Sequence, residues 1–193
     1  MKTVIVDYDA GNVKSLQFAL ERLGVVAQIT HDSELISSAD KVIFPGQGEA
    51  ASAMEKLRSK GLDTLIPQLK QPVLGICLGM QLLCKQTEEG NTQGLGILPE
   101  KVVRFPNTVK VPQMGWNTVN HKAEGLFEGI AQDCYMYLVH SYFIPLTDAT
   151  IAQSDYAGAY SVAVQKDNFC GVQFHPEKSS KDGLRLLENF LKF

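Results

Sequence analysis

The sequence has no apolar run long enough to cross a bilayer. Its richest apolar stretch, Val73 to Met80, is interrupted by glycines and is much shorter than the roughly 20 residues that a membrane-spanning helix needs. Met1 to Val4 lead directly into a strand-like segment and do not resemble a signal peptide. We therefore expect a cytoplasmic protein without a membrane partner.

An excess of positive charge and the usual metal-binding patterns are also missing. The chain has 18 Lys and Arg against 21 Asp and Glu, so it lacks the basic surplus of a nucleic-acid binder. Its four cysteines form no C-x-x-C pair, no histidines stand at zinc-finger spacing, and the Walker phosphate loop is absent. We expect no nucleic-acid partner and no metal or other cofactor. Three cysteines are expected as free thiols in the core: Cys84, Cys134 and Cys170.

No internal repeat, low-complexity tract or linker divides the chain. With 45% hydrophobic and 20% charged residues, its composition is close to the globular average. A length of 193 residues suits one ordinary domain. We expect residues 1–193 to form a single domain.

The first half alternates short apolar strands with helical patterns, which is typical of β-α-β units and a parallel sheet. The expected strands are 4–6, 25–29, 42–44 and 73–76, and the expected helices are 16–23, 33–38, 49–59 and 78–85. After Gly94 the extended segments are 95–105, 108–120, 134–142, 151–156, 160–165 and 169–174, followed by a helix at 181–192. These patterns predict an α/β fold with a central, mostly parallel sheet flanked by helices. Additional antiparallel strands belong to the C-terminal half.

Cys77 occupies the centre of a G-x-C-x-G pattern, Gly75-Ile76-Cys77-Leu78-Gly79. This pattern is the cysteine counterpart of the nucleophile elbow, in which a tight strand-to-helix turn exposes the reactive side chain. The N-terminus of the following helix would stabilise the thiolate, which is the attacking form. The alternative is that the two glycines only let strand and helix pack closely.

A cysteine nucleophile needs a base, and His175 is the best candidate among four histidines. It precedes Pro176 and Glu177, and the Glu177 carboxylate could orient the imidazole as the third member of a triad does. The alternative is a His-Pro turn with a solvated Glu. His31 and His121 lie in polar, loop-like stretches, so we expect them at the surface.

Acyl transfer also needs donors for an oxyanion, which the backbone N–H groups of a glycine-rich loop can supply. Pro45-Gly46-Gln47-Gly48 is such a loop, and the N–H of Leu78 would be a second donor. The same loop could instead be a plain turn.

Taken together, Pro45-Gly46-x-Gly48, the elbow with Met80-Gln81, and His175-Pro176-Glu177 resemble the class I, triad-type glutamine amidotransferases. Within that family, further stretches are similar to the glutaminase subunits of imidazole glycerol phosphate synthases, from histidine biosynthesis. These stretches are Asp7-Tyr8 with Gly11-Asn12, Met80 to Leu83, Met114 to Asn117, Val139 to Tyr142 and His175 to Ser180.

The resemblance implies a flavodoxin-like fold in which Cys77 attacks the side-chain amide of L-glutamine, His175 passes a proton to departing ammonia, and Glu177 holds His175. It implies an oxyanion hole from Gly46, Gln47, Gly48 and Leu78, and glutamine contacts from Gly48, Gln81, Ser141 and Tyr142. Such a subunit docks on a separate (β/α)8 cyclase, which uses the ammonia to form imidazole glycerol phosphate and an aminoimidazole carboxamide ribotide. The implied docking face contains Asn12, Trp116, Tyr137 and Lys178.

Two residues depart from the family pattern. Gln47 and Asp9 both stand where a small residue is expected. Alternative functions are a glutaminase subunit for another acceptor, such as anthranilate or pyridoxal phosphate synthesis, and a cysteine peptidase or stress protein on a similar sheet. A third is a binding module with a buried Cys77. Without the family, Trp116 could equally be a core residue and Lys178 an ordinary solvated lysine.

Overall fold

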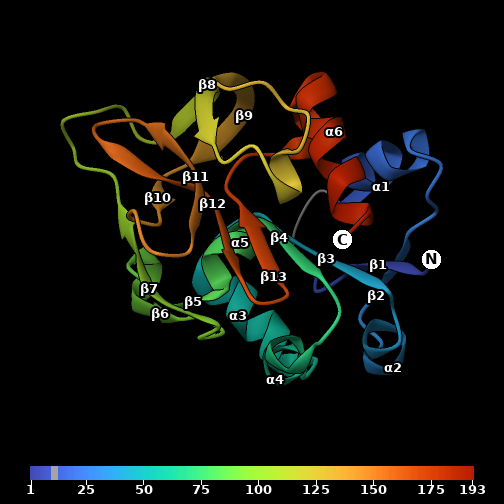
Figure 1. Ribbon diagram of the computed structural model, residues 1–193. Coiled ribbons are helices and arrows are strands. Elements are labelled where there is room, and N and C mark those ends of the chain that lie inside the picture. The colour runs from blue at the N-terminus through green and yellow to red at the C-terminus, as the bar shows by residue number, and fades with distance from the viewer. Residues whose placement is uncertain (10–12) are drawn as a thin grey trace.

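The computed structural model describes residues 1–9 and 13–193 (Figure 1). Its strands are β1 (Thr3–Val6), β2 (Gln28–Thr30), β3 (Lys41–Gly46), β4 (Val73–Cys77), β5 (Cys84–Thr87), β6 (Thr92–Gln93), β7 (Leu98–Arg104), β8 (Gln113–His121), β9 (Cys134–His140), β10 (Tyr142–Phe143), β11 (Thr150–Asp155), β12 (Ala159–Lys166) and β13 (Phe169–Val172). The α-helices are α1 (Val13–Arg22), α2 (Ser33–Ser37), α3 (Ala50–Ser59), α4 (Leu62–Leu65), α5 (Leu78–Leu82) and α6 (Ser180–Leu191). The short 3-10 helices are η1 (Ile66–Gln68), η2 (Glu89–Asn91), η3 (Gly125–Phe127) and η4 (Pro176–Lys178).

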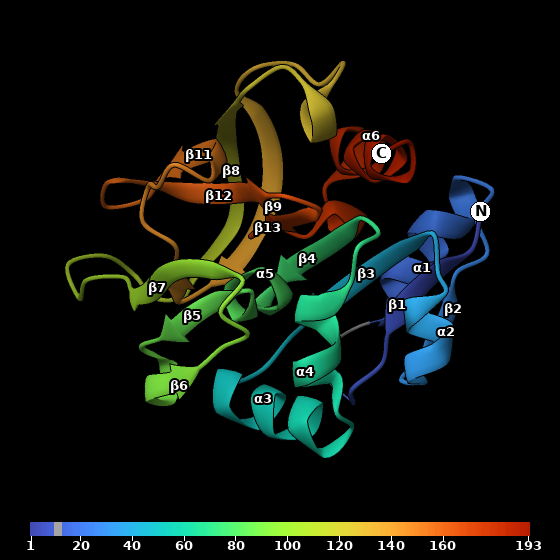
Figure 2. The same ribbon diagram turned by 60° about the horizontal axis from the view of Figure 1, so that its bottom comes forward.

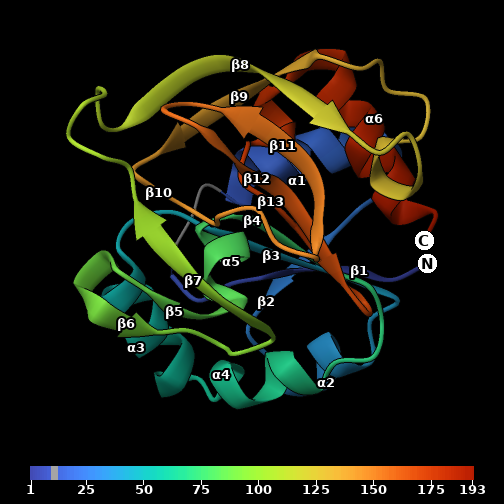
Figure 3. The same ribbon diagram turned by 60° about the vertical axis from the view of Figure 1, so that its left-hand side comes forward.

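Nine strands of the described residues form one mixed sheet, in the order β2-β1-β3-β4-β13-β12-β11-β8-β9. Neighbours from β2 to β13 run parallel, and neighbours from β13 to β9 run antiparallel. The predicted α/β fold, with a parallel sheet and additional antiparallel strands, is therefore confirmed. A smaller sheet, β10-β7-β5-β6, lies to one side (Figure 3).

Helices cover both faces of the parallel strands, with α1 and α6 on one side and α3 and α4 on the other (Figure 2). The strand side chains alternate accordingly. Ile5, Ile43 and Leu74 pack with the residues of α1 and α6, whereas their neighbours Val4 and Val42 pack with those of α2 to α5. This alternation buries apolar surface on both faces, which is why these strands are nearly continuous apolar runs.

Some local predictions are wrong. The helix expected at 78–85 ends at Leu82, because Cys84 to Thr87 pair with β7 as strand β5. His121 is buried rather than exposed: it lies on β8, and its ring stacks on Phe127 with centroids 4.5 Å apart. The expectation of buried free thiols at Cys84, Cys134 and Cys170 is confirmed. No helix in the described residues is long and apolar enough to span a membrane.

Candidate active site

Cys77 lies at the junction between β4 and α5, as the elbow pattern predicts. Its backbone has φ 54° and ψ −112°, a conformation that residues with a side chain rarely adopt. Such strain persists only where the surrounding structure fixes it, and it is concentrated at functional sites. The side chain is 8% exposed and opens into a cavity.

Gly79 makes this turn possible because α5 passes directly over β3. A Cβ atom at position 79 would lie 2.0 Å from the carbonyl oxygen of Phe44. Backbone atoms of the central sheet cannot move aside as the end of a flexible side chain can. The second glycine of the elbow is therefore required for close packing, in addition to keeping the approach to Cys77 clear.

We expect Gly79→Ala to destabilise the protein by about 3 kcal/mol or more, because overpacking against backbone cannot relax. Equilibrium denaturation of the purified chain measures this change. Gly24→Ala is the matched control: Gly24 has φ +76° and no atom within 4 Å of an added Cβ, so only backbone strain of about 1 kcal/mol is expected there. Equal losses in the two variants would contradict the packing role of Gly79.

His175 and Glu177 reach the site because β13 inserts beside β4. The parallel register pairs Val172 with Ile76, so the residues that follow β13 emerge next to Cys77. The Nδ1 atom of His175 lies 2.9 Å from Oε1 of Glu177, and the two side chains are only 3% and 4% exposed. The backbone N–H of His175 donates to the carbonyl of Tyr137 at 2.9 Å, which fixes the loop against β9.

The surroundings of His175 favour its protonated form. Burial alone would lower its pKa, but hydrogen bonding to Cys77 and Glu177, together with their negative charges, outweighs burial and raises the pKa to about 9. At neutral pH the imidazole is therefore cationic beside the sulfur of Cys77. A cationic imidazole beside a cysteine sulfur can stabilise a thiolate by its charge and can protonate a leaving group.

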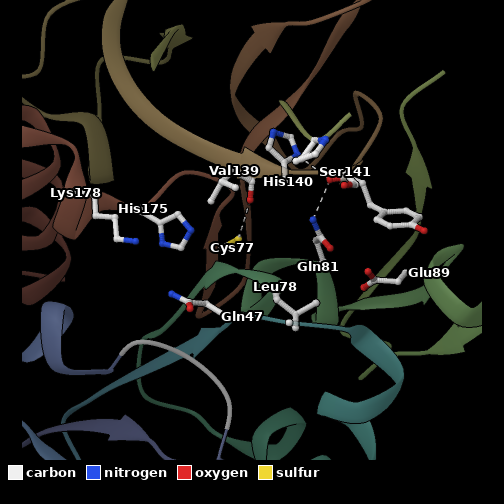
Figure 4. Close-up of a pocket in the computed structure, with 13 residues that line it drawn as sticks. Gln47, Cys77, Leu78, Gln81, Glu89, Val139, His140, Ser141, His175 and Lys178 are labelled. Atoms are coloured by element: carbon white, nitrogen blue, oxygen red, sulfur yellow. Dashed lines mark hydrogen bonds between the residues drawn. The ribbon is translucent and has the colours of Figure 1, made fainter. Parts of the chain in front are cut away.

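Besides a nucleophile and a base, acyl transfer needs hydrogen-bond donors for the oxyanion and room for a substrate. The candidate residues for both lie around a cavity of about 340 Å³. Predicted site residues that line it are Gln47, Gly48, Cys77, Leu78, Gln81, Ser141, Tyr142, His175 and Lys178. Figure 4 shows Cys77 at the centre, with His175 and Gln47 on one side and Gln81 and Glu89 on the other. Glu177 does not line this cavity and lies behind His175.

The glycine-rich loop starts directly beside the elbow, because Gly46 of β3 pairs with Cys77 of β4. Tyr8, fully buried beneath it, donates a hydrogen bond from its hydroxyl to the carbonyl of Pro45 at 2.8 Å. Gly48 has φ +96°, which a residue with a side chain would adopt only under strain. The loop is thus anchored at Pro45 and has conformational freedom at Gly48.

The chain matches the family "Glutamine amidotransferase class-I" over residues 4–193. The chain belongs to the class I glutamine amidotransferases. It is 52% identical over 194 residues to the imidazole glycerol phosphate synthase subunit HisH of Bacteroides thetaiotaomicron, covering 99% of both chains. It is 47% identical over 190 residues to the protein of that name from Haemophilus influenzae, covering 97% of this chain and 96% of the other.

Solved structures agree on the fold of this amidotransferase. A putative GMP synthase protein from Thermoplasma acidophilum is 24% identical and superposes with a TM-score of 0.77, covering 100% of this chain and 93% of the other. A crystal structure described as a glutamine amidotransferase is 22% identical, with a TM-score of 0.77 and coverage of 98% and 97%.

The amidotransferase cavity also contains residues that the sequence did not single out, above all Glu89. Its carboxylate lines the cavity and accepts a hydrogen bond from the backbone N–H of Ala50 at 2.8 Å. No motif distinguishes Glu89 from the adjacent Glu88, which instead pairs with Lys101 at the surface. Only the path of the chain from α5 through β5 brings Glu89 to the cavity.

Residues of the expected docking face lie close together near the amidotransferase site. Trp116 and Tyr137 form a cross-strand pair between β8 and β9, with ring centroids 6.1 Å apart, and Trp116 is 52% exposed. Trp116 is therefore not a core residue. It lines a shared surface hollow with Glu177 and the exposed Lys178. The fourth expected residue, Asn12, lies outside the described residues.

Proposed function

We propose that this chain is the glutaminase subunit of an imidazole glycerol phosphate synthase, and that residues 1–193 act as one glutaminase domain. It hydrolyses L-glutamine to glutamate and ammonia for a separate (β/α)8 cyclase in the cytoplasm. The observation that carries the chemistry is the strained Cys77, facing a cavity beside the buried His175–Glu177 pair. The full-length similarity to subunits of that name supports the choice of acceptor.

In the first half-reaction, the Cys77 thiolate attacks the side-chain carbonyl carbon of glutamine. The tetrahedral intermediate collapses when the C–N bond breaks, and protonated His175 gives its proton to the departing nitrogen. The raised pKa of His175, about 9, keeps that proton available at neutral pH. Ammonia leaves, and a glutamyl thioester remains on Cys77.

In the second half-reaction, water attacks the thioester carbon while the now neutral His175 takes a proton from it. The C–S bond breaks, which releases glutamate and restores the thiolate–imidazolium pair. In both halves the developing oxyanion needs N–H donors, for which we propose the backbone of Leu78 and of Gly46, Gln47 and Gly48. The loop donates through its backbone, so the unusual side chain of Gln47 is compatible with this role.

We further propose that Glu89 and Gln81 bind the α-ammonium group of glutamine, with Gly48, Ser141 and Tyr142 completing the substrate contacts. The Nε2 atom of Gln81 donates to the carbonyl of Tyr142 at 2.9 Å and to Oε1 of Gln173 at 2.9 Å, which leaves its oxygen for the substrate. That oxygen lies on the Glu89 side of the cavity (Figure 4). Burial raises the pKa of Glu89, and a bound cation would relieve that cost.

The cyclase docks, in this proposal, on the face that holds Trp116, Tyr137 and Lys178. Two hydrogen bonds of the Tyr137 backbone tie this face directly to the loop that carries His175. The N–H of Tyr137 donates to Oγ of Ser179 at 3.0 Å, and its carbonyl accepts from the N–H of His175 at 2.9 Å. A partner that binds β9 and shifts Tyr137 would therefore change the hydrogen bond that holds the backbone of His175.

We expect the isolated chain to be a poor glutaminase, and the cyclase with its own ligand bound to raise turnover by about two to three orders of magnitude. This is the effect of adding one oxyanion donor, worth roughly 3 kcal/mol. The glycines of the loop allow a peptide flip, and docking would favour the flipped loop by binding it preferentially.

Glutaminase kinetics of the isolated chain, the complex and the liganded complex test this expectation. Isolation of the tagged chain from a cell extract should also yield the (β/α)8 protein. If the isolated chain turns over glutamine as fast as the liganded complex, the expected activation by a loop flip is wrong. If the liganded complex does not consume glutamine at all, the proposed function is wrong.

A further inference from the structure

Gln173 is a buried polar residue that the mechanism above uses only as a hydrogen-bond partner of Gln81. It follows β13 directly, and its side chain is 0% exposed. The parallel register that pairs Val172 with Ile76 continues by one step to place Gln173 beside Cys77. Its Nε2 atom lies 3.7 Å from Sγ of Cys77, within hydrogen-bonding distance for a sulfur acceptor.

The orientation of the Gln173 amide is determined by its neighbours. A backbone carbonyl can only accept, so the Gln81 side chain must turn its NH₂ group toward the carbonyl of Tyr142, at 2.9 Å. The same NH₂ group faces Gln173 at 2.9 Å, where it needs an acceptor, so the Gln173 oxygen must point to Gln81. The Gln173 NH₂ group is then left to face the sulfur.

Two partners of the sulfur other than His175 suit its two protonation states. The carbonyl of Val139, 3.9 Å from Sγ, can only accept, so it interacts favourably with the thiol. The Gln173 amide can only donate through its NH₂ group, and a donor binds a thiolate more strongly than a thiol because the acceptor is charged. Removal of water from this buried pair increases the difference.

We propose that Gln173 is a positioning residue that holds the Cys77 thiolate, with its own amide fixed through Gln81 by the Tyr142 carbonyl. It helps the nucleophile form before glutamine attack and again when the thioester is hydrolysed. This inference rests on the proposed function, in which Cys77 is the nucleophile. It adds a donor to the sulfur that is separate from His175 and from the oxyanion loop.

Gln173→Glu is the sharpest test because it is nearly isosteric. A carboxylate still accepts from Gln81, but it replaces the donor beside the sulfur with a negative charge. Gln173→Met removes the polarity at similar volume without adding charge. The control is Gln153→Glu, which adds the same charge at an exposed position of β11.

Two measurements separate positioning from general damage. The first is the rate at which iodoacetamide alkylates Cys77 in the purified chain at fixed neutral pH, which needs no glutamine. The second is kcat and KM for glutamine in the cyclase complex, beside ammonia-dependent synthesis. We expect Gln173→Met to lower alkylation rate and kcat by about 10- to 100-fold, the range for losing a hydrogen bond to a charged group, with KM changing less than about threefold. Gln173→Glu should lower the alkylation rate and kcat further than Gln173→Met, and Gln153→Glu should match the wild type in both.

The outcomes are distinct. Wild-type alkylation and kcat in Gln173→Met would overturn the inference, and so would Gln173→Glu behaving like the wild type, because shape alone would then suffice. If Gln173→Glu does not fold, as thermal unfolding would reveal, Gln173→Met decides. A wild-type complex that consumes no glutamine refutes the proposed function, while the alkylation comparison still tests Gln173.

Discussion

The Cys77→Ala complex is expected to make its product from added ammonia at close to the wild-type rate and to make essentially none from glutamine. Cys77 is the only nucleophile proposed for the amide, so its loss should cost at least about four orders of magnitude in glutamine-dependent turnover. In the proposed function, the acceptor chemistry lies on the cyclase and needs only ammonia. Both activities are measured on the same reconstituted complex.

Cys134→Ala is the matched control for this experiment. Cys134 is also a buried free thiol, on β9, but it does not line the cavity at Cys77. This variant should retain both activities, because removing one buried sulfur there changes only local packing. Continued use of glutamine by Cys77→Ala would remove Cys77 from the mechanism, and loss of both activities would point to a failure of docking.

His175→Ala should be nearly inactive with glutamine, whereas Glu177→Gln should retain a measurable fraction of wild-type turnover. In the proposed mechanism, proton transfer to ammonia requires His175 itself, whereas Glu177 orients the ring from 2.9 Å and raises its pKa. Loss of an orienting carboxylate is less severe than loss of the base in other triads. Steady-state kcat of the two complexes compares these effects, and equal inactivity would require a more direct role for the carboxylate.

The pH dependence of these complexes gives a second readout. His175 is protonated below its pKa of about 9 and neutral above it. If its proton is needed by the leaving ammonia, kcat of the wild-type complex should fall as the pH rises through that value. The Glu177 carboxylate is one of the groups that raise this pKa, so Glu177→Gln should begin to lose activity at a lower pH. If kcat falls at the same alkaline pH in both complexes, the result would contradict the assignment of His175 as the proton donor.

Local patterns in the sequence determined the elements around the site. The alternation of apolar strands and helical faces predicted the parallel strands and both covering layers, because burial on two faces requires continuous apolar runs. The elbow at Cys77 was also predictable, because the G-x-C-x-G pattern lies where an apolar strand meets a helical pattern. The closing helix near 181–192 followed from its apolar stripe, and the structure has α6 at Ser180–Leu191.

The tertiary structure decided which of these elements meet. No local pattern near β13 predicts that this strand pairs with β4, yet that pairing brings His175 and Gln173 to Cys77. Glu89 likewise reaches the cavity only because the chain returns to Ala50 at the start of α3, and His121 is buried only because η3 places Phe127 against its ring. The physical reason is that propensity and periodicity act over a few residues, whereas strand order is set by the burial and hydrogen bonding of the whole sheet. Local sequence therefore specified the chemical groups, and the packing of the complete sheet specified their geometry.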